Sequence, residues 1–207
     1  MIELYTWSTP NGRKVSILLE ELGIPYSVHP IDIGKGEQHA PAFLEIAPNN
    51  RIPAIRDTES GLTLMESGAI MLHLAETHGR FIGTGETRAR AIEWLMWQMG
   101  GLGPMAGQAH HFLHYNRGKA PYAEERYAAE TKRLYGVLDR RLAAHGHVAG
   151  EYTIADMAIF PWVARHPRQD IDLAAFPAVQ SWYRSLAERP AVVRGYNVPI
   201  AEEMPQA

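Results

Sequence analysis

The sequence predicts an α/β domain over residues 1–80, followed by an all-helical domain over residues 87–207. Two observations lead to this fold class. Residues 1–80 mix strand-like alternation with amphipathic helical spacing, whereas the periodic stretches after residue 86 all repeat with helical spacing. The Gly-rich stretch RFIGTGE (80–86) breaks both patterns and is interpreted as a linker. A chain of 207 residues is long enough to bury two cores.

The first elements form a strand, a helix and a strand. Residues 1–7 alternate between apolar and polar side chains, which predicts a strand. From Val15 to Leu22 the apolar residues recur at i, i+3, i+4 and i+7, which predicts an amphipathic helix that ends at Gly23. Residues 25–33 return to a strand pattern. Because strand–helix–strand units pack with parallel strands, we expect these two strands to be parallel.

The rest of the α/β domain is a short helix, a hairpin and a helix. Residues 41–48 predict the short helix. Residues 51–57 and 62–66 lie on either side of a turn and predict an antiparallel hairpin. Residues 67–79 predict a helix that ends at a glycine. The predicted order is therefore β-α-β-(α)-β-β-α.

The second domain shows helical periodicity throughout. Three groups of apolar residues share helical faces: Ile92, Leu95, Met96 and Met99; Leu134, Val137 and Leu138; Val179, Trp182, Tyr183 and Leu186. The stretch GGLGPMAGQ (100–108) is rich in glycine and proline, so we expect it to interrupt a helix. Thr153 and Asp156 have the spacing of a capping box, with Asp in place of Glu.

Composition excludes several classes of function. The net charge is −3, which argues against nucleic acid or an anionic membrane as the partner. No apolar run is long enough to predict a membrane span. The absence of cysteine excludes disulfides, thiolate metal sites and a cysteine nucleophile. No signal-peptide pattern is visible at the N-terminus, and the lack of cysteine fits a reducing compartment, so we expect a cytoplasmic protein.

Several strings, in this order along the chain, resemble one family. NNRIPAI (49–55), ESGAI (66–70) and YTIADMAIFPW (152–162) resemble the glutathione transferase superfamily. TPNGRK (9–14), GKGEQ (34–38), APNNRIPAI (47–55), QMGGLGPMAGQAHHF (98–112) and PYAEERY (121–127) are similar to its bacterial nu class, also described as glutathione-dependent disulfide-bond oxidoreductases. The resemblance covers about residues 1–195. It implies a thioredoxin-like first domain with a mixed four-stranded sheet. It also implies a helical domain that forms the second-substrate pocket and part of a homodimer interface.

The resemblance implies a site for glutathione, which carries two carboxylates, one ammonium and one thiol. Ser67 begins a predicted helix, and its hydroxyl and backbone N–H groups suit a carboxylate, although a plain N-cap would look the same. Glu66 would pair with the ammonium. Pro53 lies between strand-like residues. In the family this proline is cis and exposes the backbone of the preceding residue, Ile52, to pair with the cysteinyl part of glutathione.

Three further residues are implied as glutathione ligands. Gln38 and Arg51 are candidates for the glycyl carboxylate. Arg126 occupies the position from which the nu class reaches the ligand in the partner subunit, so this role requires a dimer. Taken by itself, Arg126 is also explained as a surface residue that pairs with Glu130 at i+4.

The segment TPNGRK raises the question of how the sulfur is activated. Read plainly, Thr9 is the N-cap and Pro10 the first helical residue, but Gly12 stands where a capping box needs Glu or Gln. Asn11 then has no evident structural role. The resemblance implies that Thr9 and Asn11 interact with the sulfur of glutathione. A hydroxyl donor and the N-terminus of a helix both favour the thiolate anion. Ser8 remains an alternative hydroxyl.

Two other kinds of residue are less suited to the chemistry. Tyr5 lies inside the first predicted strand, so we do not favour it as the activating hydroxyl. His110 and His114 lie one turn apart, but no HExxH motif or acidic third ligand accompanies them. We therefore expect no metal, and expect these histidines to line the cleft between the domains.

The sequence thus favours an enzyme with glutathione as co-substrate. The expected reaction is thiol–disulfide exchange with a small organic disulfide, in which glutathione or glutathione disulfide occupies the site. Two alternatives stay open. The enzyme would conjugate glutathione to an electrophile or reduce an organic hydroperoxide, or the protein would bind glutathione or a partner without turnover.

Overall fold

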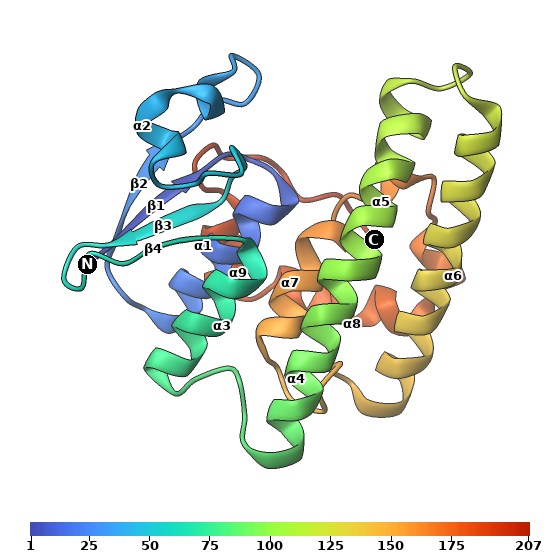
Figure 1. Cartoon of the computed structure of the whole chain (residues 1–207). Helices are drawn as coiled ribbons and strands as arrows, with labels where there is room; N and C mark the ends of the chain where they lie inside the picture. The colour runs from blue at the N-terminus through green and yellow to red at the C-terminus, as the bar shows by residue number, and fades with distance from the viewer. The chain divides into compact units, whose positions relative to one another are not determined.

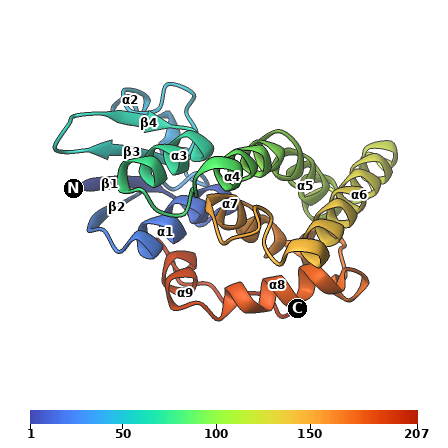
Figure 2. The same ribbon diagram turned by 90° about the horizontal axis from the view of Figure 1, so that it is seen from below.

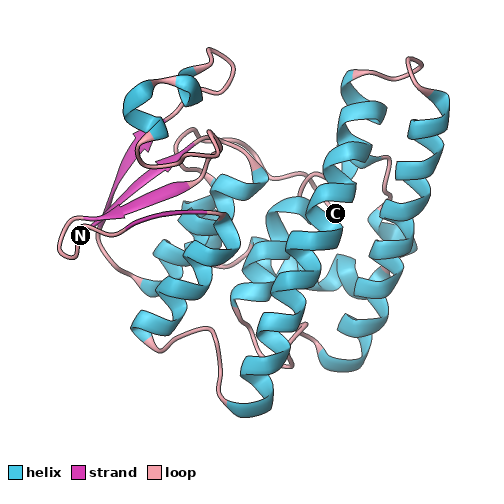
Figure 3. Cartoon of the chain, viewed as in Figure 1, coloured by secondary structure: helices cyan, strands magenta, loops and turns pink.

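The computed structural model describes residues 1–207, which form two compact units. The first unit consists of residues 1–80 and 188–203, and the second of residues 81–187 and 204–207. All strands belong to the first unit, as the colouring in Figure 3 shows. The predicted fold class is therefore confirmed. The second unit differs from the helical domain predicted over residues 87–207 in two respects: it begins at Phe81, and residues 188–203 pack with the first unit.

The first unit contains a mixed four-stranded sheet (Figure 1). Its strands are β1 (Ile2–Thr6), β2 (Tyr26–Pro30), β3 (Ala54–Asp57) and β4 (Thr63–Met65), in the order β2-β1-β3-β4. β1 and β2 are parallel, whereas β3 is antiparallel to both β1 and β4. The predicted parallel pair and the predicted hairpin are both confirmed.

Helices cover both faces of this sheet. Leu4 and Ile55 are paired in the sheet and buried, on the side of α1 (Pro10–Leu22) and α3 (Ser67–His78). The neighbouring pair, Tyr5 and Ala54, points to the opposite face because side chains alternate along a strand. There it packs with Phe43 of α2 (Pro41–Leu44). The core of the unit is therefore divided between the two faces.

The C-terminal helix α9 (Pro190–Tyr196) lies alongside α1, as Figure 2 shows. A Cβ atom added to Gly195 would lie 2.5 Å from Cα and 2.6 Å from N of Ile17, so only glycine permits this approach. The Ser16 hydroxyl donates a hydrogen bond to the Gly195 carbonyl at 2.6 Å. The backbones of α1 and α9 are therefore in direct contact at Gly195.

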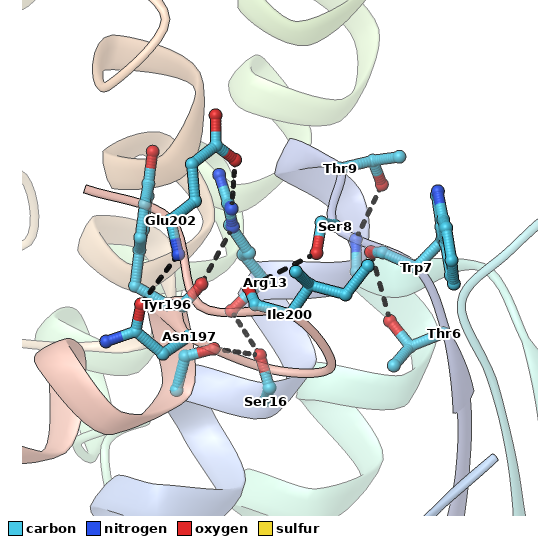
Figure 4. A network of polar contacts seen from close by, with 12 residues as sticks. Thr6, Trp7, Ser8, Thr9, Arg13, Ser16, Tyr196, Asn197, Ile200 and Glu202 are labelled. Atoms are coloured by element: carbon cyan, nitrogen blue, oxygen red, sulfur yellow. Dashed lines mark hydrogen bonds and ion pairs between the residues drawn. The ribbon is translucent and has the colours of Figure 1, made fainter. Parts of the chain in front are cut away.

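A buried arginine extends this contact beyond α9 (Figure 4). The Arg13 side chain has no exposed surface, its Nε donates to the Tyr196 carbonyl at 2.9 Å, and its guanidinium lies 3.7 Å above the Tyr196 ring centroid. Its Nη2 forms an ion pair with the Glu202 carboxylate. Asn197, the residue after Tyr196, accepts a hydrogen bond through its side-chain oxygen from the Glu202 N–H at 3.0 Å. The chain after α9 is therefore bound to the first turn of α1.

The second unit is helical. Its α-helices are α4 (Gly85–Trp97), α5 (Gly103–Ala109), α6 (Pro121–His145), α7 (Ile154–Val163) and α8 (Pro177–Ala187). Two π-helical segments, Gln98–Leu102 and His110–Tyr115, follow α4 and α5. None of the helices combines the length and apolar composition that a bilayer crossing requires.

The interruption expected within residues 100–108 takes the form of a π-helical segment. α4 ends at Trp97 and the π-helical segment Gln98–Leu102 separates it from α5, so the chain stays helical while the α-helical hydrogen-bond pattern is interrupted. Pro104 follows this segment as the second residue of α5, where a proline is tolerated. The glycines also serve packing. A Cβ atom on Gly107 would lie 3.2 Å from the ring of Trp162 in α7, and one on Gly103 would lie 3.3 Å from its indole nitrogen. Small residues thus let α5 approach this bulky side chain.

The predicted capping box of α7 is confirmed. The Thr153 hydroxyl accepts the N–H of Ala155, and Asp156 accepts the N–H of Thr153 at 3.1 Å. Asp156 is fully buried and also accepts the indole N–H of Trp182 at 3.0 Å. The carboxylate therefore connects the start of α7 to α8 in the core of the second unit.

Candidate functional site

The sheet register gathers most predicted site residues at one edge of the first unit. Tyr5, near the end of β1, pairs with Ala54 at the start of β3, and Ala54 pairs with Met65 at the end of β4. The segments that follow β1, precede β3 and follow β4 therefore leave the sheet at the same edge. These segments contain Thr9, Asn11, Ile52, Pro53, Glu66 and Ser67.

Thr9 is the N-cap of α1. Its backbone is extended, its Oγ1 accepts the N–H of Gly12 at 3.2 Å, and Pro10 follows as the first helical residue. A hydroxyl has one donor and two acceptor sites, so the cap leaves its proton able to reach an anion. Asn11 is half-buried in the first turn, where the helix dipole also favours negative charge. Structural and chemical roles are therefore compatible at Thr9.

Gly12 has a structural reason that the sequence alone did not reveal. A Cβ atom at this position would lie 2.4 Å from Oγ1 of Thr6 and 2.4 Å from the carbonyl oxygen of Trp7. The glycine thus lets the first turn of α1 sit against the end of β1. Figure 4 shows the loop of residues 7–9 between β1 and α1. In this loop the Thr9 N–H donates a hydrogen bond to the Trp7 carbonyl at 2.7 Å.

Ser67 is the first residue of α3 and is 3% exposed. The N-cap position belongs to Glu66, which has a φ of 71° and an exposed side chain that makes no cap hydrogen bond. The interpretation of Ser67 as a plain N-cap is therefore wrong. No side-chain cap hydrogen bond is made at the N-terminus of α3, and the helix dipole there favours an anion.

Sequence reasoning missed Lys14. This lysine is 1% exposed, and its Nζ lies 3.3 Å from the Ser67 hydroxyl oxygen. Burial lowers the pKa of its ammonium to about 7, and the charge of Glu66 partly offsets this. A signal was present, because Lys14 precedes Leu18 and Leu22 at i+4 and i+8 and so interrupts the apolar stripe of α1.

The Ile52–Pro53 peptide bond is cis, as the resemblance implies. The Ile52 side chain packs on the apolar cluster that contains Phe43 and Ala54, so it points into the protein. Pro53 is buried. The backbone of Ile52 lies outside β3, next to the start of that strand, where an added extended segment would find it.

Gln38 lies in the short 3-10 helix Glu37–His39, and His39 connects this helix to the segment that contains Asn50 and Arg51. The Gln38 amide nitrogen lies 3.3 Å from one ring nitrogen of His39, and the Asn50 amide nitrogen lies 3.0 Å from the other. The Gln38 carbonyl oxygen is shielded from solvent and makes no hydrogen bond. Arg51, beside Asn50, is exposed. Gln38 and Arg51 therefore lie in two segments that are linked through the contacts of His39.

Arg126 belongs to the second unit and is exposed on α6. Arg126 makes no direct contact with Glu130, which instead makes two contacts of 2.7 Å with Arg133, but the charge of Arg126 helps to lower the pKa of the Glu130 carboxyl. Arg126 lines a surface groove of about 660 Å³ together with Met105, Tyr122 and other residues of α6.

The alternative hydroxyls have other partners. The Tyr5 hydroxyl donates to Glu3 at 3.0 Å, and burial together with this carboxylate raises the pKa of the phenol. Ser8 lies 3.5 Å from the carbonyl oxygen of Ile200 in the C-terminal segment. These contacts leave Thr9 as the better-placed hydroxyl.

The histidines of the second unit lie in a positive environment. The rings of His110 and His114 are 5.3 Å apart, and His110 stacks on Tyr115. Burial and the charges of Arg168, His114 and Arg165 lower the pKa of His110 to about 4. Neighbouring arginines oppose a bound cation, and the chain contains no group of three or more His, Asp or Glu side chains arranged to hold a metal ion.

Comparison with known proteins identifies the family. Residues 4–85 match the family model for the glutathione S-transferase N-terminal domain, and residues 102–190 match that for the C-terminal domain. The disulfide-bond oxidoreductase YfcG of Escherichia coli is 52% identical over 199 residues, which cover 92% of each chain.

Solved structures agree with this result. A glutathione transferase from Pseudomonas putida, with one glutathione disulfide bound per subunit, superposes with a TM-score of 0.90 at 41% identity, over 96% of this chain and 91% of that one. A glutathione transferase from Burkholderia graminis, with two glutathione molecules per subunit, gives 0.88 at 42% identity, over 96% and 88%. The chain, with its mixed four-stranded sheet and helical second unit, belongs to the glutathione S-transferase family.

Proposed function

We propose that the protein is an enzyme that reduces small organic disulfides with glutathione as its co-substrate. The observation that carries this proposal is the Thr9 hydroxyl at the N-terminus of α1, on the same sheet edge as cis-Pro53 and Ser67, in a chain without cysteine. The similarity to YfcG, a disulfide-bond oxidoreductase, supports the reaction type. The reacting sulfur therefore comes from glutathione.

The exchange takes place in two steps. In the first, the thiolate of one glutathione attacks the organic disulfide, whose S–S bond breaks while a mixed disulfide forms. The released thiolate takes up a proton. In the second, a second glutathione thiolate attacks the glutathione sulfur of the mixed disulfide and releases the other thiol. Two glutathione molecules are oxidised to one glutathione disulfide, and the substrate gains two electrons.

The protein supplies binding, orientation and stabilisation of the thiolate. Thr9 and Asn11, with the dipole of α1, lower the pKa of the bound thiol. The Ile52 backbone next to Pro53 pairs with the cysteinyl part. Ser67 and Glu66 hold the glutamyl end, and Gln38 and Arg51 hold the glycyl carboxylate. The Burkholderia graminis relative binds two glutathione molecules per subunit, the number that this scheme consumes, and the Pseudomonas putida relative binds the glutathione disulfide that it forms.

The first test compares three substrates in the presence of glutathione. Turnover of 2-hydroxyethyl disulfide should exceed that of an aryl halide and of an organic hydroperoxide. Faster conjugation of the aryl halide would replace the oxidoreductase proposal with the transferase alternative. Tight binding of glutathione with no turnover of any substrate would identify a binding protein.

The second test addresses the residues of α1. Thr9→Ala and Asn11→Ala should raise the pKa of the bound thiol, measured by thiolate absorbance against pH, and slow the exchange about tenfold to a hundredfold. Thr9→Ser keeps the hydroxyl and serves as the matched control. A Thr9→Ala/Asn11→Ala double variant with full activity would refute the assignment.

We also propose that the protein is a homodimer in which Arg126 reaches the glutathione of the partner subunit. Arg126→Ala should raise KM for glutathione, whereas Arg133→Ala, on the same helix and paired with Glu130, should not. Mixing Arg126→Ala with Ser67→Ala subunits tests the cross-subunit role. Half of the dimers would be mixed and would hold one intact site of two, so about a quarter of the wild-type activity should return. No recovery would refute the proposal.

The proposed donor also suggests the compartment. Glutathione supplies electrons in the reducing cytoplasm, where the exchange would have its substrate in excess. Cell fractionation with an antibody to the protein tests this placement.

A further inference from the structure

A buried lysine lies directly behind the serine proposed to bind the glutamyl carboxylate. Lys14, in the second turn of α1, has only 1% of its surface exposed. Its Nζ is 3.3 Å from Oγ of Ser67, the first residue of α3. A lysine is rarely buried to this degree without a specific partner. The ammonium is therefore placed where α1 meets the positive end of α3.

Glu66 contributes acidic charge near this lysine. It stands at the start of α3, and its charge favours the ammonium form of Lys14, against the effect of burial. Arg13, the neighbour on α1, is directed to the C-terminal segment and pairs with Glu202. The Tyr196 ring of α9 lies against the Arg13 guanidinium. Other titratable groups packed on α1 lie further along it: His73, Glu76 and His78 on α3, Arg80, which donates to the Glu21 and Leu22 carbonyls, and Arg189 and Arg194, paired with Glu21 and Glu20.

A carboxylate on Ser67 would change this balance. It would bring negative charge to within a few ångströms of the Lys14 nitrogen, in a site with little water to screen it. The ammonium form would then be favoured over the neutral amine, which the burial of the empty site favours. Ligand binding and protonation of Lys14 would each promote the other, as linkage requires.

We propose that Lys14 is a positioning residue of the glutathione site, and that binding of the glutamyl carboxylate is coupled to the uptake of a proton by its amine. This inference rests on the proposed function, since it takes Ser67 as the carboxylate ligand. Lys14 acts through Ser67: its ammonium donates a hydrogen bond to the Ser67 hydroxyl, which then donates to the carboxylate.

The coupling predicts the direction of the pH dependence. In the ligand-free protein the pKa of Lys14 is about 7, so at pH 6 the ammonium is already present and at pH 8 it must take up a proton on binding. Affinity should therefore fall as pH rises. For a bound-state pKa well above 8, Kd should be about tenfold larger at pH 8 than at pH 6.

The experiment is calorimetric titration with S-hexylglutathione, whose blocked thiol does not titrate. For the wild type, heats measured in two buffers of different ionisation enthalpy should show uptake of about half a proton at pH 7. Lys14→Met should weaken binding roughly tenfold at pH 6 and leave only the pH dependence of the ligand's own amine. Lys14→Arg keeps the charge at both pH values and should likewise show only the pH dependence of the ligand's own amine.

A control and two contrary outcomes complete the test. Lys132→Met, at an exposed position of α6, should keep the wild-type profile. Wild-type binding without proton uptake, or a Lys14→Met effect equal at all pH values, would overturn the inference while leaving the proposed function intact. The wild-type measurement decides this even if the variants do not fold. Failure of the wild type to bind glutathione and S-hexylglutathione at any pH would instead overturn the proposed function.

Discussion

Gly12→Ala tests whether the first turn of α1 depends on a close approach to β1. A Cβ atom at residue 12 would lie 2.4 Å from both Oγ1 of Thr6 and the carbonyl oxygen of Trp7. Thr6 is fully buried, and the Trp7 oxygen belongs to the backbone and already accepts the Thr9 N–H. Neither atom can yield by a simple rotation into solvent, so the loop that carries Thr9 must move.

The magnitude follows from two opposing effects. Forcing an extra methyl group into a packed site costs about 1–3 kcal/mol, and two contacts near 2.4 Å belong at the upper end of that range. Alanine in place of glycine within a helix returns about 1 kcal/mol. We therefore expect Gly12→Ala to lower the free energy of unfolding by about 2 kcal/mol. For a chain of this size, that lowers Tm by roughly 4–8 °C.

The assay combines thermal unfolding with disulfide-reductase kinetics. Because Thr9 moves with the loop, kcat/KM should fall at least about tenfold and the pKa of the bound thiol should rise. Gly136→Ala is the matched control, since a Cβ atom there would meet only the end of the Arg140 side chain, at 3.6 Å, within α6. That variant should be as stable as the wild type or up to about 1 kcal/mol more stable, with unchanged kinetics.

One result would refute the reasoning. If Gly12→Ala unfolds at the wild-type temperature and keeps wild-type kinetics, the approach of α1 to the end of β1 is not what requires glycine. Loss of stability without any change in the bound thiol's pKa would separate the structural role of Gly12 from the position of Thr9.

Three further substitutions test the packing of each unit. Glu202→Gln removes the carboxylate paired with the fully buried Arg13; because Glu202 is 36% exposed, we expect a loss of roughly 2 kcal/mol in urea unfolding, and no loss would refute the pairing. Gly195→Ala would place Cβ within 2.8 Å of three backbone atoms of Ser16 and Ile17, against one backbone and one side-chain atom for Gly12→Ala, so Tm should fall by more. Asp156→Ala leaves a buried indole N–H and two backbone N–H groups without their acceptor. The free energy of unfolding, followed by tryptophan fluorescence, should fall by roughly 3 kcal/mol, and a smaller loss than for Glu202→Gln would contradict this expectation.

The order of elements could be predicted because periodicity is a local property. Alternation in residues 1–7 and the apolar spacing from Val15 to Leu22 each report which side of an element is buried. The capping box of Thr153 and Asp156 spans four residues and was equally readable. Glycine and proline in residues 100–108 predicted an interruption but not its form, a π-helical segment, because the close packing that the glycines allow involves Trp162, more than fifty residues later.

Much of the candidate site was also predictable. Motif order placed Thr9, Asn11, Pro53 and Ser67 in one site, and the strand register brings their segments to one sheet edge. Their roles toward glutathione stay predictions until the variants are measured. The reason for Gly12 was not predictable, because the atoms that exclude a side chain there belong to the preceding strand and loop.

The sequence by itself determined the order of helices and strands, the cap of α7 and the absence of a sulfur nucleophile. Only the tertiary structure decided that Lys14 is buried against Ser67, 53 residues away, and that Arg13 pairs with Glu202, 189 residues away. The physical reason is that burial and charge pairing depend on which distant segments meet. A single lysine in the apolar stripe of α1 indicates that a polar group must lie opposite it, and the fold determines that this group is the Ser67 hydroxyl.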